Sequence, residues 1–114
     1  MHTPRIEIDL QKITYNTRKT IELYRTKGIE IAGVLKGVAG DFECAKAMVR
    51  GGIEMVCDSN VDHLIKLKEG GLDVQRMLIR TPALSEVDRV IEGVDISLNT
   101  ELAVIKRLDR KSVV

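Results

Sequence analysis

Residues 29–41 read IEIAGVLKGVAGD, an apolar run that ends in one lysine and is followed by glycines and an aspartate. The run predicts a mostly buried strand over residues 29–36. Asp41 can then cap a helix formed by the apolar positions that follow it. The chain therefore passes from strand to loop to helix within a few residues, and Lys36 stands where the strand stops.

The same order of strand, loop and helix repeats along the chain. The glycines that close the predicted helices stand at positions 28, 52, 71 and 93, at steps of 24, 19 and 22 residues. That period is typical of β/α units. Asp9 is the expected cap of the first helix, as Asp41 is of the second. The predicted strands cover residues 5–9, 29–36, 55–59, 74–81 and 95–99, and a further strand is expected to begin at 112–114.

Alternating strands and helices favour a parallel sheet with right-handed crossovers, either open and doubly wound or closed into a (β/α)8 barrel of the TIM type. Ala32, Val34 and Lys36 share one face of the predicted strand. A strand face with small and medium-sized residues and a lysine at its end suits a barrel interior, with the lysine at the mouth of the barrel. A whole barrel needs about 250 residues, whereas the chain has 114. We therefore expect residues 1–114 to form roughly the first half of an α/β barrel, without the rest of the barrel or any C-terminal β domain.

Composition excludes several classes of function. The 18 basic and 17 acidic residues leave a net charge of +1, without the basic excess of a nucleic-acid-binding module. No apolar stretch approaches the roughly 20 residues of a membrane span, and the N-terminus lacks a signal-peptide core. Cys44 and Cys57 are too few for a disulfide framework, and His63 has no partner at metal-ligand spacing. We expect a cytoplasmic protein that binds no nucleic acid, membrane or metal.

Lys36 allows two interpretations. It can be a solvated charge at a strand end, or an amine that forms an imine with a carbonyl cofactor. An amine above an apolar barrel mouth loses hydration, which makes it a usable nucleophile. Gly37 and Gly40 would leave room for a flat cofactor, and Val34 lies on the same face of the strand.

Polar residues also end the other predicted strands, and the ends of parallel strands meet at one edge of a sheet. Arg80 could hold an anionic group at the start of the next helix, or bond to backbone carbonyls. Asp58 and Ser59 could contact a ligand or cap the helix that follows them, and Asn99 has the same two options. These residues, together with Val34 and Lys36, are the candidate cofactor-binding residues.

Five segments carry a resemblance to a known family: PRIEIDLQKITYNTRK (4–19), IAGVLKGVAGD (31–41), AKAMVRGGIEMVCDSNVDHLIKLKEGG (45–71), MLIRTPALSEVDRVI (77–91) and DISLNTELAVI (95–105). Taken in this order, they resemble the alanine racemase-like barrel family, the fold-type III pyridoxal phosphate enzymes. The resemblance is greatest to the ornithine racemase branch. It covers nearly the whole chain, but only the first third or so of a family member.

The resemblance implies that pyridoxal 5'-phosphate binds Lys36 as an imine, and that the protein is a racemase that removes and returns the Cα proton of an amino acid. Alanine racemases follow this lysine with a tyrosine and a glycine-histidine-glycine turn, whereas residues 40–43 here read GDFE. The implied substrate is therefore ornithine or another basic amino acid. Tyr15 and Tyr24 lie on the first predicted helix, so the resemblance also implies a second catalytic acid from a C-terminal domain, often across a homodimer.

Two other interpretations stay open. Pyridoxal phosphate carrier or homeostasis proteins resemble the same barrel and lysine, but they lack the second domain and have no established turnover. Alternatively, the chain is a β/α domain without a cofactor, in which Lys36 is only solvated. The sequence after Val114 would separate the racemase from the carrier, and an absorbance band on adding the cofactor would exclude the last interpretation.

Overall fold

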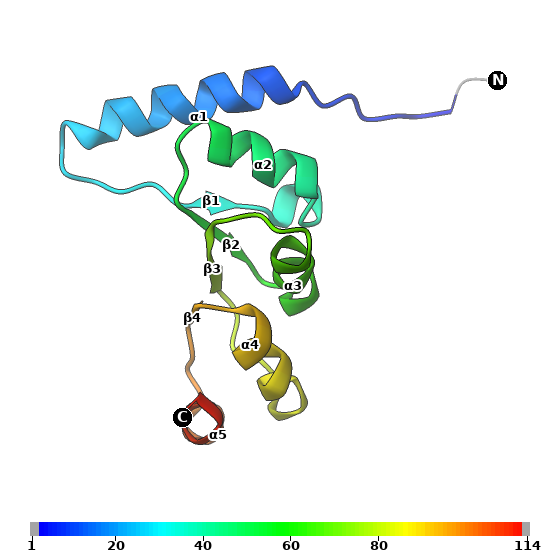
Figure 1. The fold of residues 1–114 in the computed structure, drawn as a ribbon, viewed down its shortest axis with the longest axis vertical. Helices are drawn as coiled ribbons and strands as arrows, with labels where there is room; N and C mark the ends of the chain where they lie inside the picture. Colours follow the sequence, from blue (N-terminus) through cyan, green and yellow to red (C-terminus); the bar gives the residue numbers. More distant parts are fainter. Residues whose placement is uncertain (1–2, 113–114) are drawn as a thin grey trace.

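Four short parallel strands form the centre of the structure, a computed structural model that describes residues 3–112. The strands are β1 (Gly33–Val34), β2 (Met55–Asp58), β3 (Gln75–Leu78) and β4 (Ile96–Ser97). They lie in the order β1-β2-β3-β4, so each strand pairs with the next one along the chain (Figure 1). A doubly wound sheet reverses its strand order, whereas a barrel keeps the strands consecutive. The strand order therefore favours the barrel.

Helices follow the strands in alternation. They are α1 (Leu10–Arg25), α2 (Phe42–Arg50), α3 (Val61–Glu69), α4 (Val87–Gly93) and α5 (Leu102–Ser112), with the 3-10 helices η1 (Lys36–Val38) and η2 (Leu84–Glu86). The first two expected caps are confirmed. Asp9 accepts a hydrogen bond from the backbone N–H of Lys12 at 3.1 Å, and Asp41 accepts one from that of Cys44 at 2.9 Å. None of the described helices is both long and apolar enough to cross a membrane.

The two faces of the sheet have different surroundings. Helices α2, α3 and α4 lie on one side of the strands (Figure 1). Leu35 and Leu78, which belong to the covered face, are 0% and 2% exposed. Val34 lies on the other face and is 49% exposed, and Met77 and Ile96, which continue its row across the sheet, are partly exposed. This open face corresponds to the interior of a barrel.

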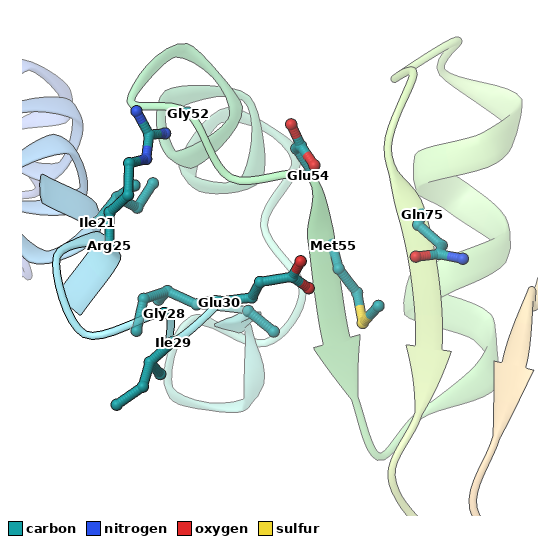
Figure 2. Close-up of a pocket in the computed structure, with 11 residues that line it drawn as sticks. Ile21, Arg25, Gly28, Ile29, Glu30, Gly52, Glu54, Met55 and Gln75 are labelled. Atoms are coloured by element: carbon teal, nitrogen blue, oxygen red, sulfur yellow. The ribbon is translucent and has the colours of Figure 1, made fainter.

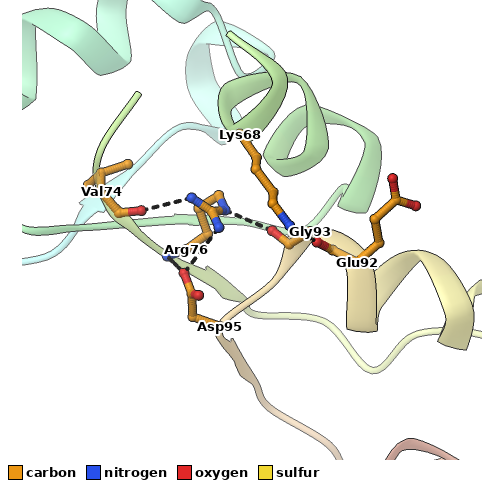
Figure 3. Close-up of polar contacts among 6 residues, drawn as sticks. All are labelled: Lys68, Val74, Arg76, Glu92, Gly93 and Asp95. Atoms are coloured by element: carbon orange, nitrogen blue, oxygen red, sulfur yellow. Dashed lines mark hydrogen bonds and ion pairs between the residues drawn. The ribbon is translucent and has the colours of Figure 1, made fainter. Parts of the chain in front are cut away.

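A mostly buried arginine joins β3 to the start of β4 at the amino end of the sheet. Arg76 Nε donates to the carbonyl oxygen of Gly93 at 2.8 Å, and its Nη1 donates to that of Val74 at 3.0 Å (Figure 3). The backbone N–H of Arg76 donates to the Asp95 carboxylate at 2.8 Å, and Nη2 lies 3.5 Å from the same oxygen. These bonds fix the point where α4 ends and β4 begins.

Three expected strands differ from the structure. Residues 5–9 form no strand: Ile6 is 90% exposed, and none of the described strands pairs with this segment to bond its backbone groups. The strand expected over 29–36 is reduced to Gly33–Val34, because β1 is an edge strand that pairs with β2 only at these two residues. The strand expected at 112–114 is wrong at Ser112, which ends α5, and residues 113–114 lie outside the described residues. The other three strands are present but shorter than expected.

Candidate functional site

Lys36 opens the connection between β1 and α2, at the carboxyl end of the edge strand. The N–H of Leu35 donates to the carbonyl oxygen of Cys57 at 2.9 Å, so the sheet holds the chain up to the residue before the lysine. The carbonyl oxygen of Leu35 then accepts hydrogen bonds from the N–H groups of Val38 at 3.2 Å and Gly40 at 3.0 Å. These bonds close residues 35–40, the Lys36 loop, into a tight turn. Lys36 itself is exposed.

The Lys36 loop leaves open space beside the lysine. Apart from its chain neighbours, a side-chain carbon at Gly37 would meet no heavy atom within 4 Å. Ala39 and Gly40 then take left-handed φ values of 52° and 70°, which turn the chain toward α2. A left-handed φ is uncommon for alanine, so the backbone at this point is held by its surroundings.

Ser59, Arg80 and Asn99 follow the neighbouring strands at the same edge of the sheet. The hydrogen-bond ladder continues past the ends of the strands, since the N–H of Ile79 donates to the carbonyl oxygen of Asp58 at 3.0 Å. The expected residues therefore do gather with Lys36 along one edge. This is the carboxyl edge, where barrel enzymes carry their chemistry.

Two of these residues line a polar hollow of about 230 Å³ at the ends of β2 and β3. Its walls include Ser59, Arg80 and Thr81, together with the acidic side chains Asp62 and Glu86. Neither Lys36 nor Asn99 lines this hollow. The structure thus brings Ser59 and Arg80 into one cavity, and leaves Lys36 beside it along the edge.

A larger cavity of about 520 Å³ lies at the opposite end of the sheet. Figure 2 shows it between the end of α1 and the first residues of β2 and β3, with Arg25, Glu30 and Glu54 in its lining. Barrel enzymes hold their chemistry at the carboxyl edge, and their amino edge serves stability. We therefore place the candidate site at Lys36 rather than in the larger cavity.

Asp58 ends β2 but points into the layer of helices, where it is 1% exposed. Its Oδ1 accepts a hydrogen bond from the N–H of Asn60 at 3.0 Å, and its Oδ2 lies 3.1 Å from Nδ1 of His63. The helix cap expected at Asp58 or Ser59 is made by Asn60 instead, whose side chain accepts from the N–H of Asp62 at 2.9 Å. A contact between Asp58 and a cofactor stays a prediction.

His63 is the residue whose connection to the site the sequence analysis missed. In the sequence, this histidine has no partner at metal-ligand spacing. A different signal was present, because a carboxylate at a buried strand position needs a hydrogen-bond donor. The first turn of the helix that follows such a strand is the nearest place to find one.

Asn99 turns back onto β4 instead of capping α5. Its Nδ2 donates to the carbonyl oxygen of Ser97 at 3.1 Å and to the Ser97 hydroxyl at 3.0 Å. Its Oδ1 is buried without a hydrogen-bond partner in the described part of the chain. Buried polar atoms are nearly always hydrogen-bonded, so this oxygen is available as an acceptor at the carboxyl edge.

Cys57 pairs with Val34 across the sheet and so belongs to the same face. Burial raises the pKa of the Cys57 thiol above its ordinary value. A thiol that stays protonated at neutral pH is a weak nucleophile.

Comparison with known proteins identifies the family. The alanine racemase N-terminal domain matches residues 8–112 of the chain. The chain belongs to this family. The resemblance that the five sequence segments indicated is thereby confirmed.

Two of the curated proteins to which this chain is similar are racemases of basic amino acids. The lysine racemase of Thermotoga maritima is 32% identical over 109 residues, which are 96% of this chain and 31% of the relative. The ornithine racemase of Acetoanaerobium sticklandii is 33% identical over 107 residues, which are 94% of this chain and 30% of the relative. The chain thus spans less than a third of either protein.

Solved structures confirm the expected fold. The alanine racemase of E. faecalis superposes with a TM-score of 0.75 at 25% identity, over 91% of this chain and 29% of that protein. The alanine racemase of Bacillus anthracis gives a TM-score of 0.72 at 18% identity, which shows the fold alone. The four parallel strands and their helices therefore correspond to the first part of the alanine racemase barrel.

Proposed function

We propose that this chain is the N-terminal part of a pyridoxal phosphate-dependent amino acid racemase, with the cofactor on Lys36. The observation that carries the proposal is an exposed amine at the carboxyl end of an edge strand, beside open space. Family membership supports it, because relatives at 32% and 33% identity are a lysine racemase and an ornithine racemase. Since the chain covers about a third of these relatives, the activity belongs to a longer protein, in which the rest of the barrel and a further domain complete the site.

The described residues fit the carbonyl side of the cofactor. A primary amine is the group that reacts with a pyridoxal carbonyl, and Gly37 leaves room for a flat ring beside Lys36. Barrel enzymes usually bind phosphate after strands seven and eight, so we assign no phosphate ligand among the four described strands. The side chains along the carboxyl edge that we propose as contacts of the cofactor are Val34, Ser59, Arg80 and Asn99.

Bound pyridoxal phosphate supplies an electron-withdrawing ring, which lets a modest base remove the Cα proton of an amino acid. Lys36 Nζ is the base that this chain provides, and it can hold the proton on one face of the substrate. Racemisation requires a second acid on the opposite face. Tyr15 and Tyr24 both lie on α1 rather than at the carboxyl edge. We therefore assign the second acid to the part of the protein outside residues 3–112, contributed by the other subunit of a homodimer.

We further propose that the substrate is a basic amino acid, ornithine or lysine. The names of the two relatives at 32% and 33% identity support this class of substrate. The alanine racemase 2 of Caldanaerobacter subterraneus is less similar, at 27% identity over 93 residues. We also propose a cytoplasmic location, which the two free, buried cysteines support.

Exchange of the Cα proton for deuterium tests the proposed function. The longer protein is loaded with pyridoxal phosphate and incubated in heavy water with ornithine, lysine and alanine in turn. We expect exchange and loss of optical activity with ornithine or lysine, and neither in Lys36→Ala. Faster exchange with alanine would contradict the substrate class. Cofactor bound to Lys36 without exchange of any amino acid would favour the carrier.

A further inference from the structure

A buried carboxylate ends β2, the strand that pairs with β1 just before the Lys36 loop. Among the described residues, Asp58 is the charged side chain that is buried, at 1% exposure. Burying a carboxylate is unfavourable unless hydrogen bonds replace those it made to water. Its partners are the N–H of Asn60 and the ring of His63, both at the start of α3. The chain therefore keeps a buried carboxyl group, with its own hydrogen-bond partners, on the strand next to β1.

Asp58 fixes the orientation of the His63 ring. Nδ1 of His63 lies 3.1 Å from Oδ2 of Asp58, within hydrogen-bond distance, so the carboxyl group and the ring hold each other in one orientation. The His63 side chain is 25% exposed, whereas that of Asp58 is 1% exposed. The position of the ring is thus set by Asp58.

The ring of His63 in turn packs against the Lys36 loop. A methyl group on Gly40 would lie 2.5 Å from both Cβ and Cγ of His63, and 2.8 Å from its Nδ1. Gly40 also has a φ of 70°, which favours glycine. Its N–H donates to the carbonyl oxygen of Leu35 and so closes the loop. The histidine therefore touches the backbone at the point where the loop is closed.

Both ends of the Lys36 loop are consequently held by β2 and α3. At its start, the N–H of Leu35 donates to Cys57 of β2. At its end, Gly40 rests on the ring of His63. Lys36 stands between these two attachments. A displacement of about 1 Å at a reacting group can reduce a rate about a hundredfold. The two attachments restrict the position of the loop that carries Nζ, so they affect the rate of a reaction at this atom.

We propose that Asp58 and His63 are positioning residues for Lys36: the carboxylate orients the ring, and the ring holds the loop that presents Nζ to the cofactor. The inference rests on the proposed function, and it assigns a role to two residues that need not touch the cofactor. It predicts a slower reaction of Lys36 when the ring is no longer held, in a protein that remains folded.

The test measures how fast and how tightly Lys36 of the longer protein takes up pyridoxal phosphate. The readouts are the absorbance of the lysine-linked cofactor and the label on the Lys36 peptide after borohydride reduction. His63→Phe keeps a ring against Gly40 but removes the donor to Asp58. His63→Asn keeps an N–H group near the Nδ1 position. Lys66→Ala, at an exposed position of the same helix, is the matched control.

We expect His63→Phe to slow the labelling of Lys36 by about ten- to a hundredfold, with circular dichroism unchanged. His63→Asn should recover a large part of the rate, and Lys66→Ala should not differ from the unaltered protein. Equal rates and affinities in His63→Phe and the unaltered protein would overturn the inference and leave the proposed function in place. No label on Lys36 in the unaltered protein would instead remove the proposed function itself.

A second pair of variants keeps the inference testable if His63→Phe does not fold. Gly40→Ala introduces a methyl group into the space that the ring occupies, whereas His63→Ala empties that space. If the ring and the loop act as one unit, the two changes are not additive. The strain of alanine at a φ of 70° remains in the double variant, but its clash with the ring is gone, so Gly40→Ala should slow labelling less in His63→Ala than in the unaltered protein. Additive losses would contradict the inference.

Discussion

Replacing Arg76 by methionine tests whether the amino edge of the sheet serves stability while the carboxyl edge serves the reaction. The guanidinium donates to the carbonyl oxygens of Gly93 at 2.8 Å and Val74 at 3.0 Å. Its ion pair with Asp95 spans 3.5 Å to a carboxylate that is 42% exposed, so it adds little. A hydrogen bond to a charged group contributes about 1.5–3 kcal/mol, and the low end for two bonds gives a loss of about 3 kcal/mol in the free energy of unfolding.

Urea unfolding of the longer protein, followed by circular dichroism, measures this loss. With a slope of about 2 kcal/mol per molar urea, the midpoint of the barrel transition should decrease by roughly 1.5 M. Arg18→Met makes the same chemical change at an exposed position of α1 and should stay within about 0.5 kcal/mol of the unaltered protein. Labelling of Lys36 by pyridoxal phosphate should persist in folded Arg76→Met. A loss no larger than that of the control would show that Arg76 does not stabilise the sheet. Loss of labelling without unfolding would show that the amino edge also affects the reaction.

Lys36→Ala should abolish the absorbance of the lysine-linked cofactor and leave the urea midpoint unchanged, because the side chain is exposed; a large decrease in the midpoint would show that Lys36 is structural. Cys44 and Cys57 should react with a thiol reagent much more slowly in the folded protein than in urea at mildly alkaline pH, because burial raises the pKa of both thiols and lowers their thiolate fraction. Rapid labelling of both in the folded state would contradict their burial. An isolated fragment of residues 1–114 should self-associate and bind pyridoxal phosphate weakly, because β1 and β4 each leave one edge unpaired and Val34 is 49% exposed. Sedimentation as a compact monomer that binds the cofactor tightly would show that the fragment is a complete domain.

The helices were predictable because their signals are local. Asp9 and Asp41 each cap the helix that the apolar pattern after them predicts. Strand ends depend instead on a partner that lies elsewhere in the chain. Residues 29–32 have the composition of a strand, yet β1 contains only Gly33–Val34, which lie opposite β2. Residues 5–9 alternate as a strand does, but none of the described strands pairs with them.

In the candidate site, the place of Lys36 was predictable, whereas the contacts between side chains were not. An apolar run that ends in Lys36 is enough to place the lysine at a strand end, which the structure bears out. The sequence could have indicated that a buried Asp58 takes a donor from the first turn of the next helix, but which side chain reaches it depends on how α3 leaves the sheet. Alternation alone could have put Asp58 on the covered face with Leu78, since paired residues of parallel strands share a face.

Identifying the lysine that carries pyridoxal phosphate tests the proposed role of Lys36 more directly than any other measurement. The longer protein is loaded with the cofactor, reduced with borohydride and digested, and the modified peptide is identified by mass spectrometry. We expect a pyridoxyl group on Lys36, and no modified peptide from Lys36→Ala. A pyridoxyl group on any other lysine, with Lys36 unmodified, would contradict the proposed role.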